Sequence, residues 1–336
     1  MEQSVAEEET SRSHFERLRG QLRVPFDAGE FVPPPRFATA TFASYQIDGA
    51  VAGQAAAVDG IQAFVVAGSP RWWQWRRRGE RRGLYLDGDF GVGKTHLLAA
   101  AFHAATGRRR YLSFSEAISL LIAHGLSATV DLLQGDLLCL DEFELDDPSN
   151  TRHADQLIDR LVSAGTRLIV TSNTVPGELG VGRMFVDQFR NQLARVAATF
   201  ADIHVPGEDY RRRHGRAGAS GQGWGPTVTP LPSGPVIDAD ELDRLLRDIP
   251  VVSLRRLAAG LPALSITGMT PRPDQLCALR LVHLVDRLYD WRVPLRVQAD
   301  CAIDELFLPG YRELGFAKKY RRCQSRLIEL CAEATA

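Results

Sequence analysis

One eight-residue segment constrains the fold of this chain more than any other: Gly88-Asp89-Phe90-Gly91-Val92-Gly93-Lys94-Thr95. It fits the pattern G-x-x-x-x-G-K-[ST] and stands between a strand-like run, 83–86, and a segment of helical composition, 94–105. Glycines let backbone N–H groups wrap around phosphates, and the start of the helix favours negative charge. The pattern therefore predicts a phosphate-binding loop, with Lys94 on the β- and γ-phosphates and the Thr95 hydroxyl on Mg²⁺.

The rarity of lysine supports this prediction. The chain has 40 Lys and Arg residues, and the only lysines are Lys94, Lys318 and Lys319. A compact ammonium and a planar guanidinium are not interchangeable. A chain that uses arginine nearly everywhere but lysine at position 94 indicates a site where arginine will not serve.

Segments typical of strands and helices alternate around the loop. We expect strands at 83–86, 110–114, 137–140, 167–171 and 201–205, and helices at 51–66, 94–105, 115–124, 151–164 and 186–198. Ser115 is the expected N-cap of the helix at 115–124, and 39–45 is expected to be a short strand or extended segment. This alternation predicts an α/β fold, a P-loop NTPase with a parallel sheet and helices on both faces.

The length of 336 residues favours about two domains. We expect an N-terminal leader and extended segment at 1–45, an ATPase core at 46–210, and a flexible linker or long loop rich in Gly, Pro, Ser and Arg at 211–235. A smaller C-terminal α/β domain is expected at 236–336. Its patterns indicate one β-α-β unit, with strands at 263–266 and 294–298, helices at 239–247 and 274–290, and a last helix at 317–330.

Two acids follow the apolar run 137–140. Asp141 fits the carboxylate that Mg²⁺ requires, directly or through water. Glu142 fits a general base that polarises the attacking water. The pair after a P-loop therefore points to nucleotide hydrolysis rather than to binding alone. The chain lacks the guanine-reading motif N-K-x-D, and this absence favours ATP over GTP.

Several runs resemble one family. They are GLYLDGDFGVGKTHLL (83–98), LLCLDEFELDDPSNT (137–151), TSNTVPGELG (171–180), GEDYRRR (207–213), PPPRF (33–37) and LVHLVDRLYDWRVPLRV (281–297). Together they resemble the ZapE family of AAA+ ATPases, cell-division-associated bacterial proteins with mitochondrial relatives. The resemblance implies an oligomeric ATPase that uses ATP and Mg²⁺ and remodels or regulates a protein partner, FtsZ or another division protein.

The resemblance also implies roles for further residues. In AAA+ ATPases the residue after the strand at 167–171, often Asn, senses the γ-phosphate, which points to Asn173. Such oligomers complete each site with an arginine from the neighbouring subunit. Arg183 is the favoured candidate, ahead of Arg190 and Arg195. For an arginine acting from the C-terminal region the choice among Arg321, Arg322 and Arg326 stays open.

The flanking residues leave alternatives open. His96 is expected in the adenine pocket or in a structural contact, and Gln54 near the base. The cluster WWQWRRR at 72–78 fits a nucleic-acid or membrane surface, or a helix end whose tryptophans pack beside the sheet while the arginines stay in solvent. The arginines at 211–216 leave the same choice open, and a solvated loop is favoured there. A nucleotide-gated nucleic-acid-binding protein, similar to helicase loaders, is therefore the alternative function.

Composition bounds the cellular setting. The formal net charge is −1, so the chain as a whole is not polybasic. The acidic N-terminus lacks the apolar region of a signal peptide, and no run reaches the ~18 apolar residues of a membrane span. The five cysteines form no C-x-x-C pair and predict reduced thiols. We expect a cytoplasmic protein without a transmembrane segment.

Overall fold

A computed structural model describes residues 20–22, 24–66, 82–145, 148–175, 186–207, 223–312 and 316–334. The chain divides into two compact units. The P-loop unit contains the described residues from Phe26 to Gly215. The C-terminal unit contains those from Arg216 onward, together with the described residues up to Pro25. Among all the residues that the structure describes, no helix combines the length and apolar character needed to cross a membrane.

The P-loop unit is built on a five-stranded parallel sheet in the order β2-β3-β4-β1-β5. The strands are β1 (Gly83–Asp87), β2 (Arg109–Ser113), β3 (Leu137–Asp141), β4 (Arg167–Thr171) and β5 (Phe200–His204). All five run in the same direction, so their carboxyl ends meet at one edge of the sheet. Strand β1 is buried along its whole length, as expected of a parallel strand covered on both faces.

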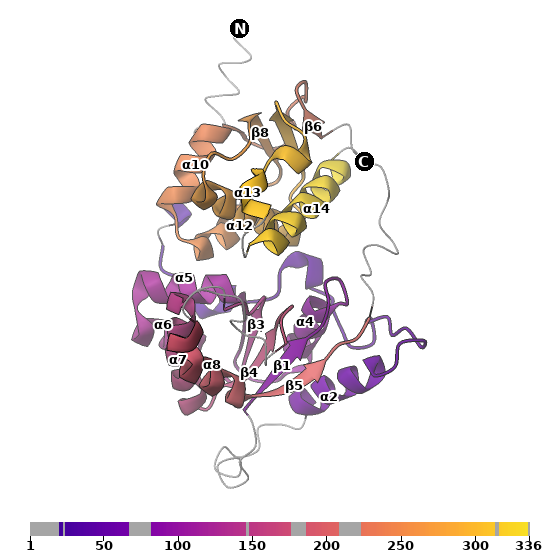
Figure 1. Cartoon of the computed structure of the whole chain (residues 1–336), viewed down its shortest axis with the longest axis vertical. Coiled ribbons are helices and arrows are strands. Elements are labelled where there is room, and N and C mark those ends of the chain that lie inside the picture. Colours follow the sequence, from indigo (N-terminus) through magenta and orange to yellow (C-terminus); the bar gives the residue numbers. More distant parts are fainter. Residues whose placement is uncertain are drawn as a thin grey trace. The chain divides into compact units, whose positions relative to one another are not determined.

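Helices cover both faces of this sheet (Figure 1). Helices α2 (Gln54–Val66) and α4 (Lys94–Ala104) pack on one face. The other face carries α5 (Phe114–His124), α6 (Leu126–Leu133), α7 (Pro148–Ser163) and α8 (Val186–Thr199). The predicted P-loop α/β architecture, a parallel sheet with helices on both faces, is therefore confirmed.

Two local predictions in this unit are wrong. Residues 39–45 form turns instead of a strand, because Thr41 and Ser44 hydrogen-bond each other through both backbone and side chains. The N-cap of α5 is Ser113 instead of Ser115. Its hydroxyl accepts from the backbone N–H of Glu116, and the Glu116 carboxylate accepts from the N–H of Ser113, which completes a capping box.

The C-terminal unit has its own parallel sheet, in the order β6-β9-β8-β7. Its strands are β6 (Trp224–Gly225), β7 (Val236–Asp238), β8 (Leu264–Met269) and β9 (Leu295–Ala299). The pattern of the sequence indicates only β8 and β9, because β6 and β7 are too short to show an alternation. Strand β6 lies inside the segment expected as a linker.

The helices of the C-terminal unit are α10 (Ala239–Asp248), α11 (Leu254–Ala259), α12 (Gln275–Trp291), α13 (Pro309–Arg312) and α14 (Ala317–Glu333). Short 3-10 helices stand at Val251–Ser253 and Ile303–Glu305. Helices α12 and α14 pack against each other. Leu22, near the start of the chain, is buried in the apolar core of this unit.

Candidate nucleotide site

The P-loop adopts backbone conformations that require glycine. Gly88, Gly91 and Gly93 have φ of 144°, 74° and 92°. A Cβ on Gly88 would lie 2.3 Å from the carbonyl oxygen of Val205, and one on Gly93 would lie 2.6 Å from the ring of Tyr45. Glycine is therefore required here both by conformation and by space, as a loop that wraps phosphates demands.

Lys94 is the first residue of α4 and lies buried beneath the loop. Its ammonium donates to the carbonyl oxygens of Gly88 and Asp89, at 2.7 Å each, and to Oδ1 of Asn173 at 2.9 Å. Burial lowers the pKa of Lys94 to about 8, although nearby carboxylates oppose this. The ammonium is therefore held by three oxygen acceptors beneath the P-loop.

Asp141, the last residue of β3, lies among three hydroxyl groups. Thr171 donates to its Oδ1 at 2.5 Å, Thr95 donates to Oδ1 at 3.3 Å, and Tyr111 donates to Oδ2 at 3.2 Å. Burial raises the pKa of Asp141, the charge of Glu142 raises it further, and the hydroxyl groups oppose the change. A cation beside this carboxylate would relieve that electrostatic cost.

The Thr95 hydroxyl and the Asp141 carboxylate fit a Mg²⁺ ion bound with nucleotide. Both present oxygen atoms, the ligand type that Mg²⁺ prefers, and they lie within hydrogen-bond distance of each other. Mg²⁺ usually takes one or two protein ligands and completes its shell with water and substrate phosphates. When bound, the ion would supply positive charge beside the phosphates.

Glu142 stands in a left-handed backbone conformation, with φ of 55°. Its N–H donates to the Thr171 hydroxyl at 3.0 Å and to Oδ1 of Asp141 at 3.2 Å. A non-glycine residue in this region is strained, and such strain gathers at functional sites.

Asn173 lies just beyond the end of β4 and joins two charged groups. Its Oδ1 accepts from Lys94, and its Nδ2 donates to Oε1 of Glu144 at 3.1 Å. The structure thus brings Lys94, Asp141 and Asn173 to the same edge of the sheet. Glu144 was not among the candidates from the sequence, since nothing in its run, DEFELDD, distinguishes it from the acids around it.

The segment before α2 packs over the P-loop. The Tyr45 hydroxyl donates to the carbonyl oxygen of Val92 at 2.8 Å. Nε2 of His96 contacts Oγ of Ser44 at 3.0 Å and the carbonyl oxygen of Thr41 at 3.1 Å. His96 therefore makes a structural contact with the turn at 41–44.

Gln54 connects the start of α2 to the chain that follows β5. Its Oε1 accepts from the N–H of Asp48 at 2.7 Å, and its Nε2 donates to the carbonyl oxygen of Pro206 at 2.9 Å. Gln54 is buried. Its amide therefore holds two backbone segments together close to the P-loop.

The arginine candidates fall into different environments. Arg183 lies outside the described residues, as does the side chain of Arg190. Arg195 pairs with Asp155 of α7, and its place near the end of α8 puts it at the edge of the sheet opposite to the P-loop. The WWQWRRR cluster and the arginines at 211–216 also lie outside the described residues.

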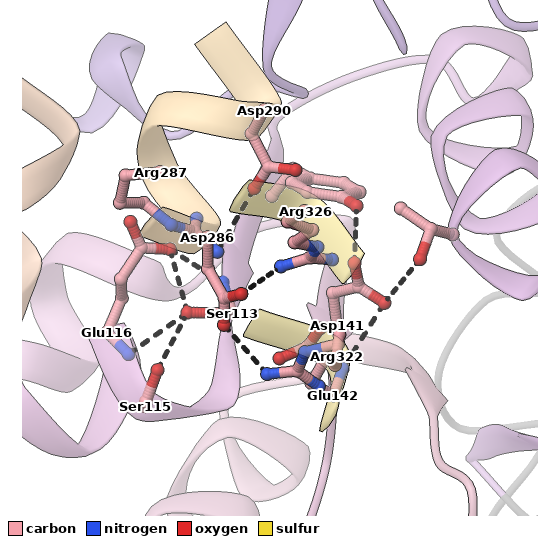
Figure 2. A network of polar contacts seen from close by, with 12 residues as sticks. Ser113, Ser115, Glu116, Asp141, Glu142, Asp286, Arg287, Asp290, Arg322 and Arg326 are labelled. Atoms are coloured by element: carbon pink, nitrogen blue, oxygen red, sulfur yellow. Dashed lines mark hydrogen bonds and ion pairs between the residues drawn. The ribbon is translucent and has the colours of Figure 1, made fainter. Parts of the chain in front are cut away.

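In the C-terminal unit, Arg322 and Arg326 of α14 converge on Asp286 of α12 (Figure 2). The Arg322 guanidinium donates to the Asp286 carboxylate at 2.7 Å. Burial alone would raise the pKa of Asp286, but these arginines hold it well below its usual range. Arg321 is exposed on the same helix. The two buried arginines thus have a defined partner inside their own unit.

Comparison with known proteins places the chain in a family. The family model described as AFG1-like ATPase matches residues 32–222 and 257–335, well over half of the chain. Curated proteins gave no match.

Several solved structures resemble the chain. DnaA from Aquifex aeolicus with AMPPCP shows 19% identity, a TM-score of 0.36 and coverage of 50% of each chain. DnaI shows 19% identity, a TM-score of 0.42 and coverage of 55% of this chain and 99% of its own. The DnaC helicase loader shows 21% identity, a TM-score of 0.37 and coverage of 51% of this chain and 98% of its own. This chain spans about half the length of the first structures that it matches.

Proposed function

The chain belongs to the AFG1-like ATPase family, which contains ZapE, and on that premise we propose that it hydrolyses ATP with Mg²⁺ at the carboxyl edge of the P-loop sheet. The observation that supports this most is the meeting of Lys94, Asp141 and Asn173 at that edge. In this proposal, these three segments, far apart in the sequence, would supply a phosphate ligand, a metal ligand and a γ-phosphate sensor at one place.

Each residue of the site has a role in this proposal. The glycines of the P-loop present backbone N–H groups to the phosphates, and Lys94 exchanges its present carbonyl acceptors for phosphate oxygens. Thr95 and Asp141 would hold Mg²⁺, which would supply positive charge beside the phosphates. Glu142 polarises the attacking water, and Asn173 donates to the γ-phosphate.

We further propose that the chain acts as a homo-oligomer in which Arg183 of one subunit reaches the γ-phosphate bound by the next. Hydrolysis would then change contacts between subunits and so remodel a partner in cell division. FtsZ is the first partner to test, on the basis of the resemblance to ZapE. A cytoplasmic location follows from that partner.

Steady-state ATP hydrolysis tests these statements separately. Turnover should be lost in Lys94→Ala and in Glu142→Gln, and Glu142→Gln should retain bound ATP, because only the attack by water is removed. Asp59→Ala, which removes an exposed acid from α2, is the control and should behave like the wild type. Turnover of Glu142→Gln within about twofold of wild type would contradict the role of Glu142.

Protein concentration and FtsZ give the second part of the test. Turnover per chain should rise with protein concentration if the site is shared between subunits, and it should respond to purified FtsZ. An ATPase that depends on Lys94 but is indifferent to both would contradict the shared site and that partner, while the hydrolysis itself would stand.

A further inference from the structure

Glu144 follows a turn that is held rigidly in the P-loop unit. Phe143, the residue before it, donates its N–H to the carbonyl oxygen of Thr171 at 2.7 Å and is fully buried. The Phe143 ring packs against the rings of Phe114, at 4.6 Å between centroids, and Tyr85, at 6.3 Å. Leu145, the residue after Glu144, is buried as well. The backbone at Glu144 is therefore anchored on both sides, and its carboxylate is held beside the end of β4.

The contact between Glu144 and Asn173 determines how the amide of Asn173 is oriented. A carboxylate only accepts hydrogen bonds, so the Asn173 group that faces Glu144 must be the NH₂. An ammonium only donates, so the group that faces Lys94 must be the amide oxygen. Lys94 and Glu144 together leave the amide a single orientation.

Nucleotide binding would remove one of these two constraints. The three hydrogen bonds of the Lys94 ammonium now go to two carbonyl oxygens and to Asn173, and phosphate oxygens would compete for them. Once Lys94 turns to phosphate, the hydrogen bond that Asn173 donates to Glu144 is what keeps the NH₂ group in place. That group has two N–H bonds, of which Glu144 takes one and the other remains to donate.

From this geometry we propose that Glu144 is a positioning residue for hydrolysis: it holds the Asn173 amide so that its second N–H donates to the phosphoryl group under attack. The inference rests on the ATP hydrolysis proposed above. It assigns no proton transfer to Glu144, because Glu142 occupies the position of the base. Pre-oriented donors raise the rate because they need no reorganisation when charge develops on the phosphoryl oxygens.

Four variants test the proposal: Glu144→Ala, Glu144→Gln, Asn173→Ala, and the double variant Glu144→Ala with Asn173→Ala. In Glu144→Ala, kcat should fall about tenfold or more while KM stays within about threefold, since the loss concerns the transition state. Glu144→Gln should recover at least about a third of the wild-type kcat, because its amide oxygen still accepts from Asn173. The double variant should be no slower than Asn173→Ala alone, because Glu144 acts only through Asn173.

Other results would overturn the proposal. A kcat for Glu144→Ala within about twofold of wild type would show that Asn173 needs no such support. A double variant much slower than Asn173→Ala, or a Glu144→Gln as slow as Glu144→Ala, would show that the carboxylate acts directly as a base or a charge. A wild-type chain without any turnover would instead overturn the proposed function, and this inference with it.

Two controls separate positioning from damage to the fold. Asp59→Ala removes an exposed acid from the same unit and should leave kcat unchanged. The affinity of Glu144→Ala for a fluorescent non-hydrolysable ATP analogue should stay within about threefold of wild type, since Lys94 and the loop are intact. A loss of analogue binding that matches the loss of kcat would assign Glu144 to the structure of the empty site and so overturn the proposal.

Discussion

At the scale of single residues, Thr171 links the ends of β3 and β4. Its hydroxyl donates to Asp141 and accepts from the N–H of Glu142. Thr171→Val keeps the shape of the side chain but removes both bonds. We expect kcat to fall about tenfold, as when other partners of metal-ligating groups are removed. Stability should fall by about 1–3 kcal/mol, because a buried carboxylate loses a donor.

The residue just before the same strand offers a matched control for this variant. Thr166, just before β4, is buried, and its hydroxyl accepts from the N–H of Gly135 at 3.2 Å, at the opposite edge of the sheet. Thr166→Val should therefore cost stability without lowering kcat. Steady-state kinetics and urea unfolding of both variants measure the difference. If Thr171→Val and Thr166→Val had equal kcat values, Asp141 would keep its orientation without the Thr171 hydroxyl.

His283 makes the stability of the C-terminal unit depend on pH. Burial lowers its pKa to about 4, the cations of Lys319, Arg287 and Arg322 lower it further, and Asp286 opposes them. The unfolded chain, with an ordinary pKa of about 6.5, then binds more protons than the folded chain between pH 6.5 and 4. Stability should be complete above pH 6.5 and should decrease as the pH falls toward 4. At pH 5 the loss from His283 is about 1–2 kcal/mol.

His283→Gln tests this dependence, because glutamine is neutral at both ends of the range. Urea unfolding at pH 7.5 and pH 5 should show a smaller loss of stability in the variant than in the wild type. Carboxylates elsewhere titrate equally in both proteins, so the difference between the two losses isolates His283. Equal losses would place the pKa of His283 near its ordinary value in the folded chain.

Sequence patterns reach some residues of the candidate site and miss others for a physical reason. Lys94, Asp141 and Asn173 each stand at the end of a strand or the start of a helix, so the carboxyl-edge rule for parallel sheets predicts their place. Glu144 and Tyr111 act through partners that the pairing of strands and the left-handed turn at Glu142 bring near. Neither pairing nor turn geometry is written in the spacing of these residues.

At the scale of elements, the capping box of α5 carries a prediction. Ser113→Ala removes the cap and should lower the free energy of unfolding by about 1 kcal/mol. Ser115→Ala, two residues further along the chain, should lower it less. The local readout is amide hydrogen exchange at Glu116, whose N–H bonds to the Ser113 hydroxyl at 3.3 Å. Exchange there should accelerate in Ser113→Ala only. If exchange of the Glu116 amide were faster in Ser115→Ala instead, Ser115 would be the N-cap of α5.

Element prediction succeeds where buried runs are long enough to show a period. Strands β1, β3 and β4 could be predicted because parallel strands covered on both faces are nearly continuously apolar. Helix α6 was missed because it has only eight residues, of which Thr129 and Leu133 are buried. Strands β6 and β7 have two and three residues, too few for any alternation.

At the scale of the whole molecule, the path of the chain determines which strands pair and which segments share a core. No local pattern specifies that β1 lies between β4 and β5, since that order arises from long-range packing. Nor does a pattern reveal that Leu22 is part of the C-terminal core, more than 200 residues away in sequence. The chain therefore passes between the two units twice, once near residue 25 and once near residue 215.

Arg256 fastens the first of these passages to the C-terminal unit. Its guanidinium donates to the carbonyl oxygens of Gln21, Val24 and Pro25, at 3.0, 2.6 and 3.0 Å. Arg256→Ala should release residues 20–25 and speed their amide exchange about tenfold, as expected for the loss of ~1.5 kcal/mol against local opening. Nucleotide binding by the P-loop unit should not change. Arg244→Ala, an exposed arginine on α10, is the control and should leave that exchange unaltered. If Arg256→Ala also left it unaltered, burial of Leu22 alone would hold the passage, and Leu22→Ala would be the change that frees it.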